Sequence, residues 1–264
     1  MTNFSYLWRC KNSKNILAKK VNVLMTSILK KELRAFFSSA AGYIVIGIFL
    51  LLTALLLWVI PGEYNILDSG YANVDGLFYL APWLYLFLVP AVTMRFFAEE
   101  KLSGTWELLV TKPLTPWQIV LGKYIAGTIL VVLALIPTLI YYYTVSYLAE
   151  PIGNVDSGQF WGSFIGLALL AAVYVAISTF CASFSKNQII AFILSAVVCF
   201  FFYYGFDVLT SFVSGGNRIQ FIENLGIRAH YNSISRGVID SRDVIYFVVV
   251  SLIFLQLTVW KIRK

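Results

Sequence analysis

Six long runs of apolar residues constrain what this chain can fold into. They cover Gly42–Ile60, Leu77–Met94, Ile119–Tyr147, Phe160–Phe184, Ile189–Phe206 and Val244–Trp260. A helix of about 20 apolar residues is long enough to cross the hydrocarbon core of a bilayer. Only 12% of the chain is charged, against about 25% in average soluble proteins. We therefore predict an all-α polytopic membrane protein with six transmembrane helices.

Two of the runs differ in length from the rest. The third run, Ile119–Tyr147, is longer than a span needs, so we expect it to tilt or to project outward. Pro137 is expected to kink this helix, because proline removes a backbone donor from it. The sixth run, Val244–Trp260, is at the short limit for a span.

An amphipathic helix is predicted from Thr26 to Ser39, directly before the first run. Its apolar face carries Leu29, Leu33, Phe36 and Phe37, with Ile28 at the edge, and its other faces carry Lys30, Lys31, Glu32 and Arg34. A basic amphipathic helix next to a span is typical of the membrane interface. The alternative, a plain cytosolic helix, is less favoured because the chain enters lipid at once.

Residues 1–24 have a different composition. They contain five basic and no acidic residues, and they lack the apolar core of a signal peptide. We interpret them as a disordered basic extension and expect the natural start at Met25. The transmembrane domain is then expected to cover residues 25–264.

The stretch Met94–Tyr124 mixes charge, a glycine break and a short apolar run. Gly104 is interpreted as a break and Thr105 as the N-cap of a helix about two turns long, with Glu107 near its positive end. A helix of that length is not stable alone, so we expect it to be held by the adjacent spans and by a partner. Thr115-Pro116-Trp117-Gln118 has the pattern of a capping box with proline at the first helical position.

This stretch resembles the cytosolic loop of type-2 ABC exporter permeases. The shared signature is a glutamate four residues before Gly-Thr-x-Glu-Leu-Leu, then a proline, a Ser or Thr, and a Gly-Lys pair. The matching residues are Glu100, Gly104, Thr105, Glu107, Leu108, Leu109, Pro113, Thr115, Gly122 and Lys123. The alternative is an ordinary solvated loop of another polytopic protein, which the many linked spacings disfavour.

The resemblance implies that this loop contains a coupling helix, which sits in a cleft of a separate ABC ATPase subunit. The residues expected to make this contact are Glu99, Glu100, Gly104, Thr105, Trp106, Glu107, Leu108 and Leu109. Trp106 is expected to be the main anchor, and Glu100 and Glu107 to pair with basic groups or backbone donors of the partner. The resemblance further implies a second permease subunit, identical or different, and ATP with Mg²⁺ on the ATPase rather than on this chain.

Two further segments extend the resemblance to nearly all of residues 25–264. The turn Ser185-Lys186-Asn187-Gln188 contains the Asn-Gln pair of these permeases, and we interpret Ser185 and Gln188 as a capping box. The segment from His230 to Asp243 resembles the gliding-motility-associated permeases of the family. The loop 207–243 that precedes the last span is expected to form either an external cap or a partly re-entrant pair of helices.

The basic residues predict the orientation of the chain. Sixteen Lys and Arg residues lie on the side of the two termini and of loop 95–118, and four lie on the other side, all in loop 207–243. The positive-inside rule therefore places both termini in the cytoplasm, and the resemblance implies a bacterial inner membrane. The net charge of +7 is explained by these flanking residues, so a nucleic-acid partner is not expected.

Several function classes lack the residues that they require. The runs contain no Asp, Glu, Lys, Arg or His except Lys123, which disfavours an ion-coupled carrier. No phosphate-binding loop and no His-Glu-x-x-His motif is present, so the chain is not expected to be an enzyme. His230, the one histidine, is interpreted as a hydrogen-bonding loop residue, and the three cysteines have no metal or disulfide spacing.

The resemblance therefore indicates the permease subunit of an ATP-driven export complex, linked to gliding motility or secretion. The alternative is a non-transporting membrane anchor or signalling component of such an assembly.

Overall fold

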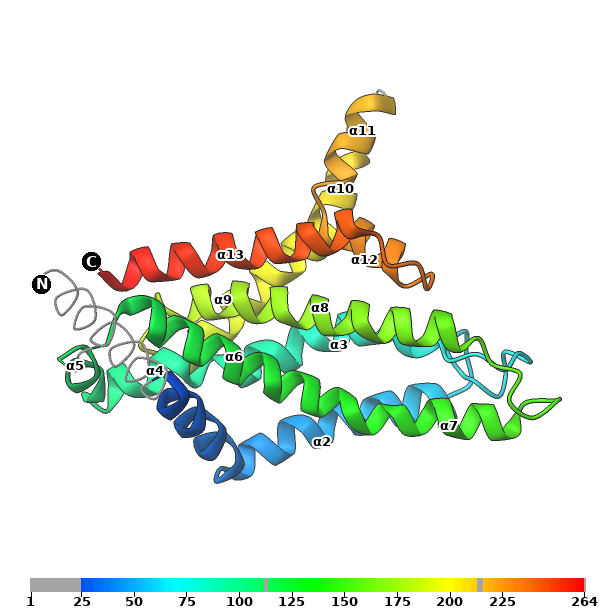
Figure 1. Cartoon of the computed structure of the whole chain (residues 1–264), viewed down its shortest axis with the longest axis horizontal. Helices are drawn as coiled ribbons and strands as arrows, with labels where there is room; N and C mark the ends of the chain where they lie inside the picture. The colour runs from blue at the N-terminus through cyan, green and yellow to red at the C-terminus, as the bar shows by residue number, and fades with distance from the viewer. Residues whose placement is uncertain (1–24, 112–113, 213–215, 264) are drawn as a thin grey trace, which may run out of the picture.

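The computed structural model describes residues 25–111, 114–212 and 216–263, and the basic segment 1–24 lies outside this part of the chain. Every regular element in the described part is a helix (Figure 1). The elements are a helix over residues 25–37, here called the N-terminal helix, followed by α2 (Ala40–Ala54), η1 (Leu55–Val59), α3 (Asp75–Thr93), α4 (Arg95–Leu102), α5 (Thr105–Val110), α6 (Pro116–Leu135), η2 (Ile136–Thr138), α7 (Leu139–Leu148), α8 (Ser157–Ala182), α9 (Gln188–Phe200), η3 (Phe201–Gly205), α10 (Phe206–Thr210), α11 (Gly216–Glu223), α12 (Ile227–Ile234) and α13 (Ser241–Arg263).

Six of these helical stretches are long and apolar enough to cross a membrane, which confirms the expected number of spans. They are Ala40–Val59, Asp75–Leu102, Pro116–Leu148, Ser157–Ala182, Gln188–Thr210 and Ser241–Arg263. The sixth has 23 residues, so the expectation that it is at the short limit was wrong. It is longer because polar residues at both ends are helical, and Lys261 and Arg263 in its last turn face the negative end of the helix dipole.

The third span has 33 residues, as its apolar run predicted. Pro137 lies in a 3-10 turn between α6 and α7, where the hydroxyl of Thr138 donates to the carbonyl oxygen of Leu135 at 2.7 Å. Figure 1 shows α7 extending to the end of the bundle opposite α5 and the C-terminus. We call the end with α4, α5 and the last turn of α13 the terminal end, and the opposite end the distal end.

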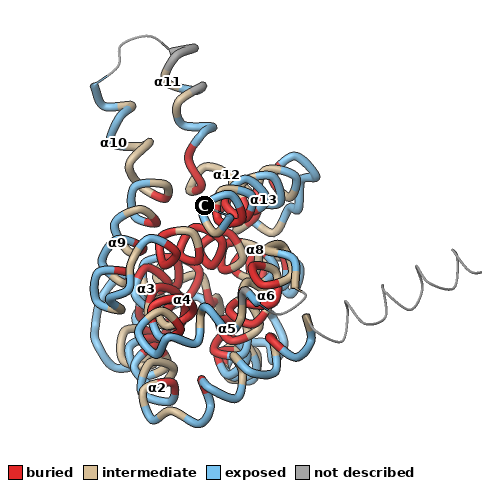
Figure 2. The backbone as a smooth tube through the Cα atoms, turned by 90° about the vertical axis from the view of Figure 1, so that its left-hand side faces the viewer, coloured by how far each residue is buried: buried red, intermediate tan, exposed pale blue. Residues whose placement is uncertain are grey.

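The core forms around α8, which packs against α3, α6, α9 and α13. Small residues bring the backbones close together: a Cβ at Gly127 of α6 would lie 2.9 Å from a methyl group of Val175 of α8. Figure 2 shows the buried residues gathered where these helices meet. By contrast, only 22% of an 18-residue apolar stretch is buried in the span that contains α2, and the same share is buried in the span that contains α9. These two spans therefore leave most of their apolar surface for lipid or for another protein.

The loop before the last span forms three short helices. Figures 1 and 2 show α10 and α11 projecting from the bundle as a pair. In α12, Ile227, Tyr231 and Ile234 are buried, and the hydroxyl of Tyr231 donates to the carbonyl oxygen of Phe78 at 2.7 Å. The loop thus contains both a projecting helix pair and a segment that packs back on the bundle.

Of the two capping boxes that the sequence predicted, one is confirmed and one needs correction. The capping box of α6 is confirmed, because the backbone N–H of Thr115 donates to the Gln118 side chain at 3.0 Å. The expected box at Ser185 was wrong: Asn187 caps α9 by accepting from the N–H of Ile189 at 2.8 Å. The hydroxyl of Ser185 instead accepts from the N–H of Asn187, which orders the turn.

The N-terminal helix packs against its own chain with a different face from the one expected. Ile28, placed at the edge of the apolar face, is 5% exposed, whereas Phe37 is 39% exposed. Leu29 and Leu33 are half-buried and Phe36 is buried. Ile28 lies against Gly122 of α6, where a Cβ would come within 3.0 Å of it. The face is rotated because α6, and not only lipid, covers this helix.

Candidate functional site

The site is built on the connection between the second and third spans, at the terminal end. The second span continues through α4 to Leu102, and the chain then reverses at Gly104, whose φ of 69° lies in the left-handed region that favours glycine. Gly104, rather than Thr105, is the N-cap of α5, so the expected capping role of Thr105 was wrong. Thr105 begins the helix, and its hydroxyl donates back to the carbonyl oxygen of Glu100 at 3.4 Å.

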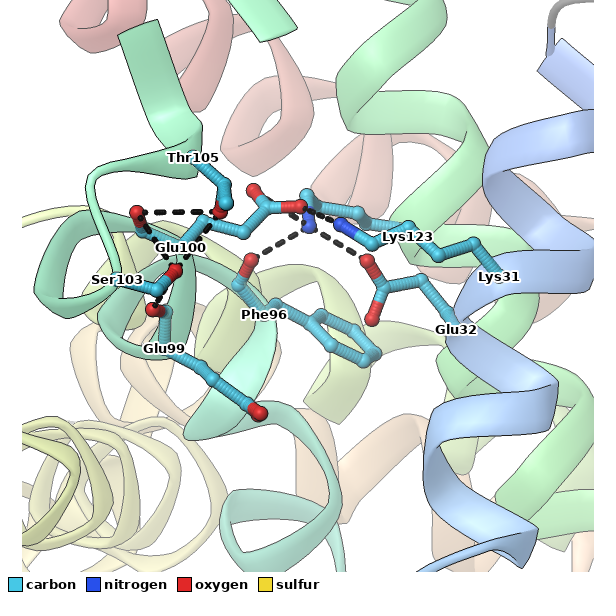
Figure 3. A network of polar contacts seen from close by, with 8 residues as sticks. All are labelled: Lys31, Glu32, Phe96, Glu99, Glu100, Ser103, Thr105 and Lys123. Atoms are coloured by element: carbon cyan, nitrogen blue, oxygen red, sulfur yellow. Dashed lines mark hydrogen bonds and ion pairs between the residues drawn. The ribbon is translucent and has the colours of Figure 1, made fainter. Parts of the chain in front are cut away.

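A buried lysine lies at the centre of the site. Lys123 of α6 has no exposed surface, and its Nζ lies 2.7 Å from Oε1 of Glu32 and 3.0 Å from Oε2 of Glu100 (Figure 3). The same nitrogen donates to the carbonyl oxygen of Phe96 at 2.5 Å. The rings of Phe96 and Phe97 lie 5.9 Å and 5.3 Å from it. The ammonium group thus donates hydrogen bonds to oxygen atoms of Glu32 and Phe96, and Oε2 of Glu100 forms an ion pair with it.

A second lysine completes the network. Lys31 of the N-terminal helix donates to Oε1 of Glu100, whose side chain is nearly buried. Burial alone would lower the pKa of Lys31, but the hydrogen bond and charge of Glu100, with the charges of Glu32 and Glu99, outweigh it and raise the pKa. Two cations therefore face two anions, which is the condition under which charges are tolerated inside a protein.

This network joins three segments that are far apart in the sequence. Lys31 and Glu32 belong to the N-terminal helix, Glu100 to α4, and Lys123 to α6 (Figure 3). We call these four residues the charge cluster. A displacement of α4 therefore acts directly on the N-terminal helix and on the start of the third span.

Two further hydrogen bonds tie α4 to neighbouring turns. The guanidinium of Arg95 donates to the hydroxyl of Ser39 at 2.7 Å, at the turn between the N-terminal helix and α2. Lys101 donates to the carbonyl oxygen of Ser183 at 2.5 Å, at the C-terminal end of α8. Cations are favourable at that end of a helix. The loop is thus also connected to the turn between the fourth and fifth spans.

The expected contact residues of the loop divide into two groups. Glu100 points inward, is 6% exposed and pairs with Lys31 and Lys123 of its own chain, and its pairing with a partner stays a prediction. The ring of Trp106 is half-buried and packs edge-on against Phe97, with ring centroids 5.7 Å apart. Trp106 therefore holds α5 to α4, in addition to any contact outside the chain.

The outer surface of the loop combines acidic and apolar side chains. Glu99 and Glu107 are exposed, and Figure 3 shows the Glu99 side chain pointing away from the charge cluster. Leu108 is 65% exposed and Leu102 is 67% exposed, while Leu109 is half-buried. Large apolar side chains at the tip of a charged loop are suited to contact with another protein. Because α5 has only six residues, its position depends on Trp106 and on the charge cluster below it.

The roles of Lys31 and Glu32 were not predicted from the sequence. Lys31 was expected at the membrane interface, and no partner was predicted for Glu32. A signal was present, because Lys123 is the one Asp, Glu, Lys, Arg or His residue within the apolar runs and its charge needs a nearby anion. The distance in sequence between Glu32 and Lys123 concealed the pairing.

A comparison with protein families assigns a family to this chain. A family model described as "ABC-2 family transporter protein" matches residues 60–222, which is more than half of the chain. The match includes the second to fifth spans, the loop with α4 and α5, and Lys123. No curated protein matches the sequence. On the strength of the family match, the chain belongs to the ABC-2 transporter family, as a membrane permease domain.

Proposed function

We propose that this chain is the membrane subunit of an ATP-driven export complex, and that α5 couples it to a separate ATPase subunit. The observation that carries the proposal is the exposed Leu108 on a short helix whose base is fixed by the charge cluster. A helix used for coupling needs a free apolar face for the partner and a rigid connection to the spans, and α5 has both. ATP and Mg²⁺ would be bound by the ATPase, and this chain would bind no cofactor.

The proposed orientation places the terminal end in the cytoplasm of a bacterium. In the sequence, sixteen of the twenty Lys and Arg residues fall in the segments assigned to that side, and the positive-inside rule associates such an excess with the cytoplasm. The ATPase would then meet α5 on the side where ATP is available. The N-terminal helix would lie at the inner membrane interface, with Lys30 and Arg34, both exposed, toward the lipid headgroups.

A second permease subunit, identical or different, is proposed to cover part of the first and fifth spans. In both spans, most residues of the apolar stretch are not buried by the rest of this chain. Their exposed surfaces include Ile44 and Ile48 of α2 and Ile193 and Val197 of α9. The path for the substrate would then form between the two subunits.

The proposed link to gliding motility or secretion is supported by the resemblance of the segment from His230 to Asp243. If that link holds, the alternative function is a non-transporting anchor or signalling component. A variant of the ATPase subunit that binds ATP but does not hydrolyse it distinguishes export from the anchor or signalling function. Export predicts loss of function with this ATPase, whereas an anchor predicts retained function.

The coupling proposal is tested by co-purification from native membranes. We expect Leu108→Asp to reduce the amount of ATPase recovered with this chain at least tenfold, because a charge replaces an apolar contact. Ile152→Asp is the matched control: Ile152 is 76% exposed and lies in the distal loop. ATPase recovery with Leu108→Asp equal to that with Ile152→Asp would refute docking through α5.

A further inference from the structure

A large polar cavity opens near the distal end, far from the charge cluster. Its volume is about 750 Å³, within the range of about 300–1,000 Å³ that small-molecule sites occupy. Its lining comes from the first residues of α3, α8 and α13 and from α11, α12 and the turns beside them. Because three spans begin here, the cavity lies at the level of the membrane boundary.

The lining has more acidic than basic groups. Among the described residues it includes four carboxylates, those of Asp75, Glu223, Asp240 and Asp243. Two guanidinium groups, of Arg236 and Arg242, and the imidazole of His230 also face it. The guanidinium-bearing residues and Asp240 are exposed, whereas Asp243 is 7% exposed. The acidic group with least access to water is therefore the one most in need of a partner.

Asp243 is held in place but only half satisfied. Its Oδ1 lies 2.7 Å from Nδ1 of His230, and the other ring nitrogen of His230 lies 2.9 Å from the carbonyl oxygen of Asn224. The ring of Tyr246 stacks on the imidazole with centroids 3.8 Å apart. This arrangement confirms His230 as a hydrogen-bonding residue. Within the described chain, Oδ2 of Asp243 accepts no hydrogen bond, which is costly for a buried carboxylate.

A second carboxylate that lines the cavity, that of Asp75, is also fixed. Gln159 of α8 donates to Oδ1 of Asp75 at 3.0 Å, which orients the carboxyl group at the start of α3. Tyr79, one turn further along α3, is 62% exposed and adds an aromatic surface to the cavity. A cation in this cavity would find carboxylate acceptors and a ring face in its lining.

We propose that this cavity binds an organic cation through a primary ammonium group. An ammonium group brings both the N–H donors that Oδ2 of Asp243 lacks and a charge that matches the acidic lining. A metal ion fits less well, because the described residues contain no group of three His, Cys, Asp or Glu side chains that could hold one. The volume is also much larger than a single ion requires.

Two sources offer this chemistry at a membrane boundary: a free polyamine and the headgroup of phosphatidylethanolamine. The test uses the purified chain in nanodiscs made of phosphatidylcholine and phosphatidylglycerol, whose headgroups lack a primary amine. Spermidine is titrated calorimetrically into these nanodiscs. In a second arm, thermal stability is compared with that in nanodiscs containing phosphatidylethanolamine.

We expect saturable binding of spermidine, or stabilisation by phosphatidylethanolamine, with wild-type protein. Asp243→Asn should weaken the response at least tenfold. Asp75→Asn provides a second variant that keeps an acceptor for Gln159, and it should weaken the response as well. Asp68→Asn is the matched control, because it removes the same charge from an exposed distal residue outside the cavity.

Three results would overturn the proposal. One is the lack of any response of wild-type protein in both arms, and another is an equal loss in Asp68→Asn, which would show unspecific charge attraction. The third is retention of the full response by both Asp243→Asn and Asp75→Asn. Neither arm requires ATP or an ATPase, so this result and that of the co-purification experiment are independent.

Discussion

At the scale of single residues, Lys123 shows how an isolated charge can be placed inside an apolar helix. Moving an ammonium group out of water costs several kcal/mol even after relaxation. Here two carboxylates, one carbonyl oxygen and two aromatic rings replace the water. The carboxylates come from segments that are about 90 and 20 residues away in sequence. The charge therefore fixes the positions of the N-terminal helix and α4 relative to α6, which apolar packing alone specifies less strictly.

We predict that Lys123→Met destabilises the protein by about 3–5 kcal/mol, because it leaves the nearly buried Glu32 without its cation and leaves Glu100 with Lys31 alone. The free energy of unfolding would be measured in mixed micelles. Lys186→Met is the control, since Lys186 is exposed in a turn and should change stability by less than about 0.5 kcal/mol. A similar small change for Lys123→Met would show that the charge cluster does not support the fold.

The contribution of Lys31 to the stability of the folded state should decrease only as the pH rises. Its pKa is raised above the ordinary value of 10.5, so the folded state holds the proton more tightly than the unfolded state. Its stabilisation is fully present below 10.5 and is lost as the pH rises through the higher pKa of the folded state. The difference in stability between wild type and Lys31→Gln should thus stay constant at neutral pH and shrink only in strong alkali. A difference that shrinks between neutral and mildly alkaline pH would contradict this assignment.

At the scale of elements, the sequence predicted local structure better than the faces that pack. The six spans and the capping box at Thr115 follow from adjacent residues, and they were predictable for that reason. The inward direction of Glu100 and the rotated face at Ile28 depend on α6, which no local pattern reveals. The cap at Asn187 was missed because Ser185 offered an equally good local pattern two residues earlier.

The short helix α5 depends on the backbone geometry of Gly104. A Cβ there would meet no described atom within 4 Å, so the cost of Gly104→Ala comes from the positive φ alone, about 1–2 kcal/mol. We predict faster amide hydrogen exchange in α5 for this variant, measured by mass spectrometry, with the spans unchanged. Gly47→Ala is the control, because Gly47 lies inside α2 with equal space and no positive φ. Unchanged exchange in α5 would show that this turn tolerates any residue.

At the scale of the whole molecule, the orientation in the membrane connects the two proposed sites. The charge cluster and α5 lie at the terminal end, and the polar cavity lies toward the distal end. In the orientation proposed from the positive-inside rule, one site meets the cytoplasm and the other the outer boundary of the membrane.

Cysteine labelling in intact cells tests this orientation. With Cys10, Cys181 and Cys199 replaced by serine or alanine, Ile152→Cys should react with a membrane-impermeant maleimide from outside. Leu108→Cys should react only after the membrane is made permeable. Both side chains are highly exposed in the structure, so access depends on sidedness. The reverse pattern of labelling would refute cytoplasmic termini.

The tie between the N-terminal helix and α4 also has a consequence for the lipids. If the N-terminal helix lies in the inner leaflet, a displacement of α4 and α5 must also move this helix through the lipid headgroup layer, because Lys31 and Glu32 tie it to α4 and α6. The lateral pressure of that layer then contributes to the free energy of the movement, and its viscosity contributes to the rate. In the proposed export complex, ATP turnover should consequently slow in stiff, tightly packed membranes and speed up in fluid ones, even where ATP and substrate are saturating.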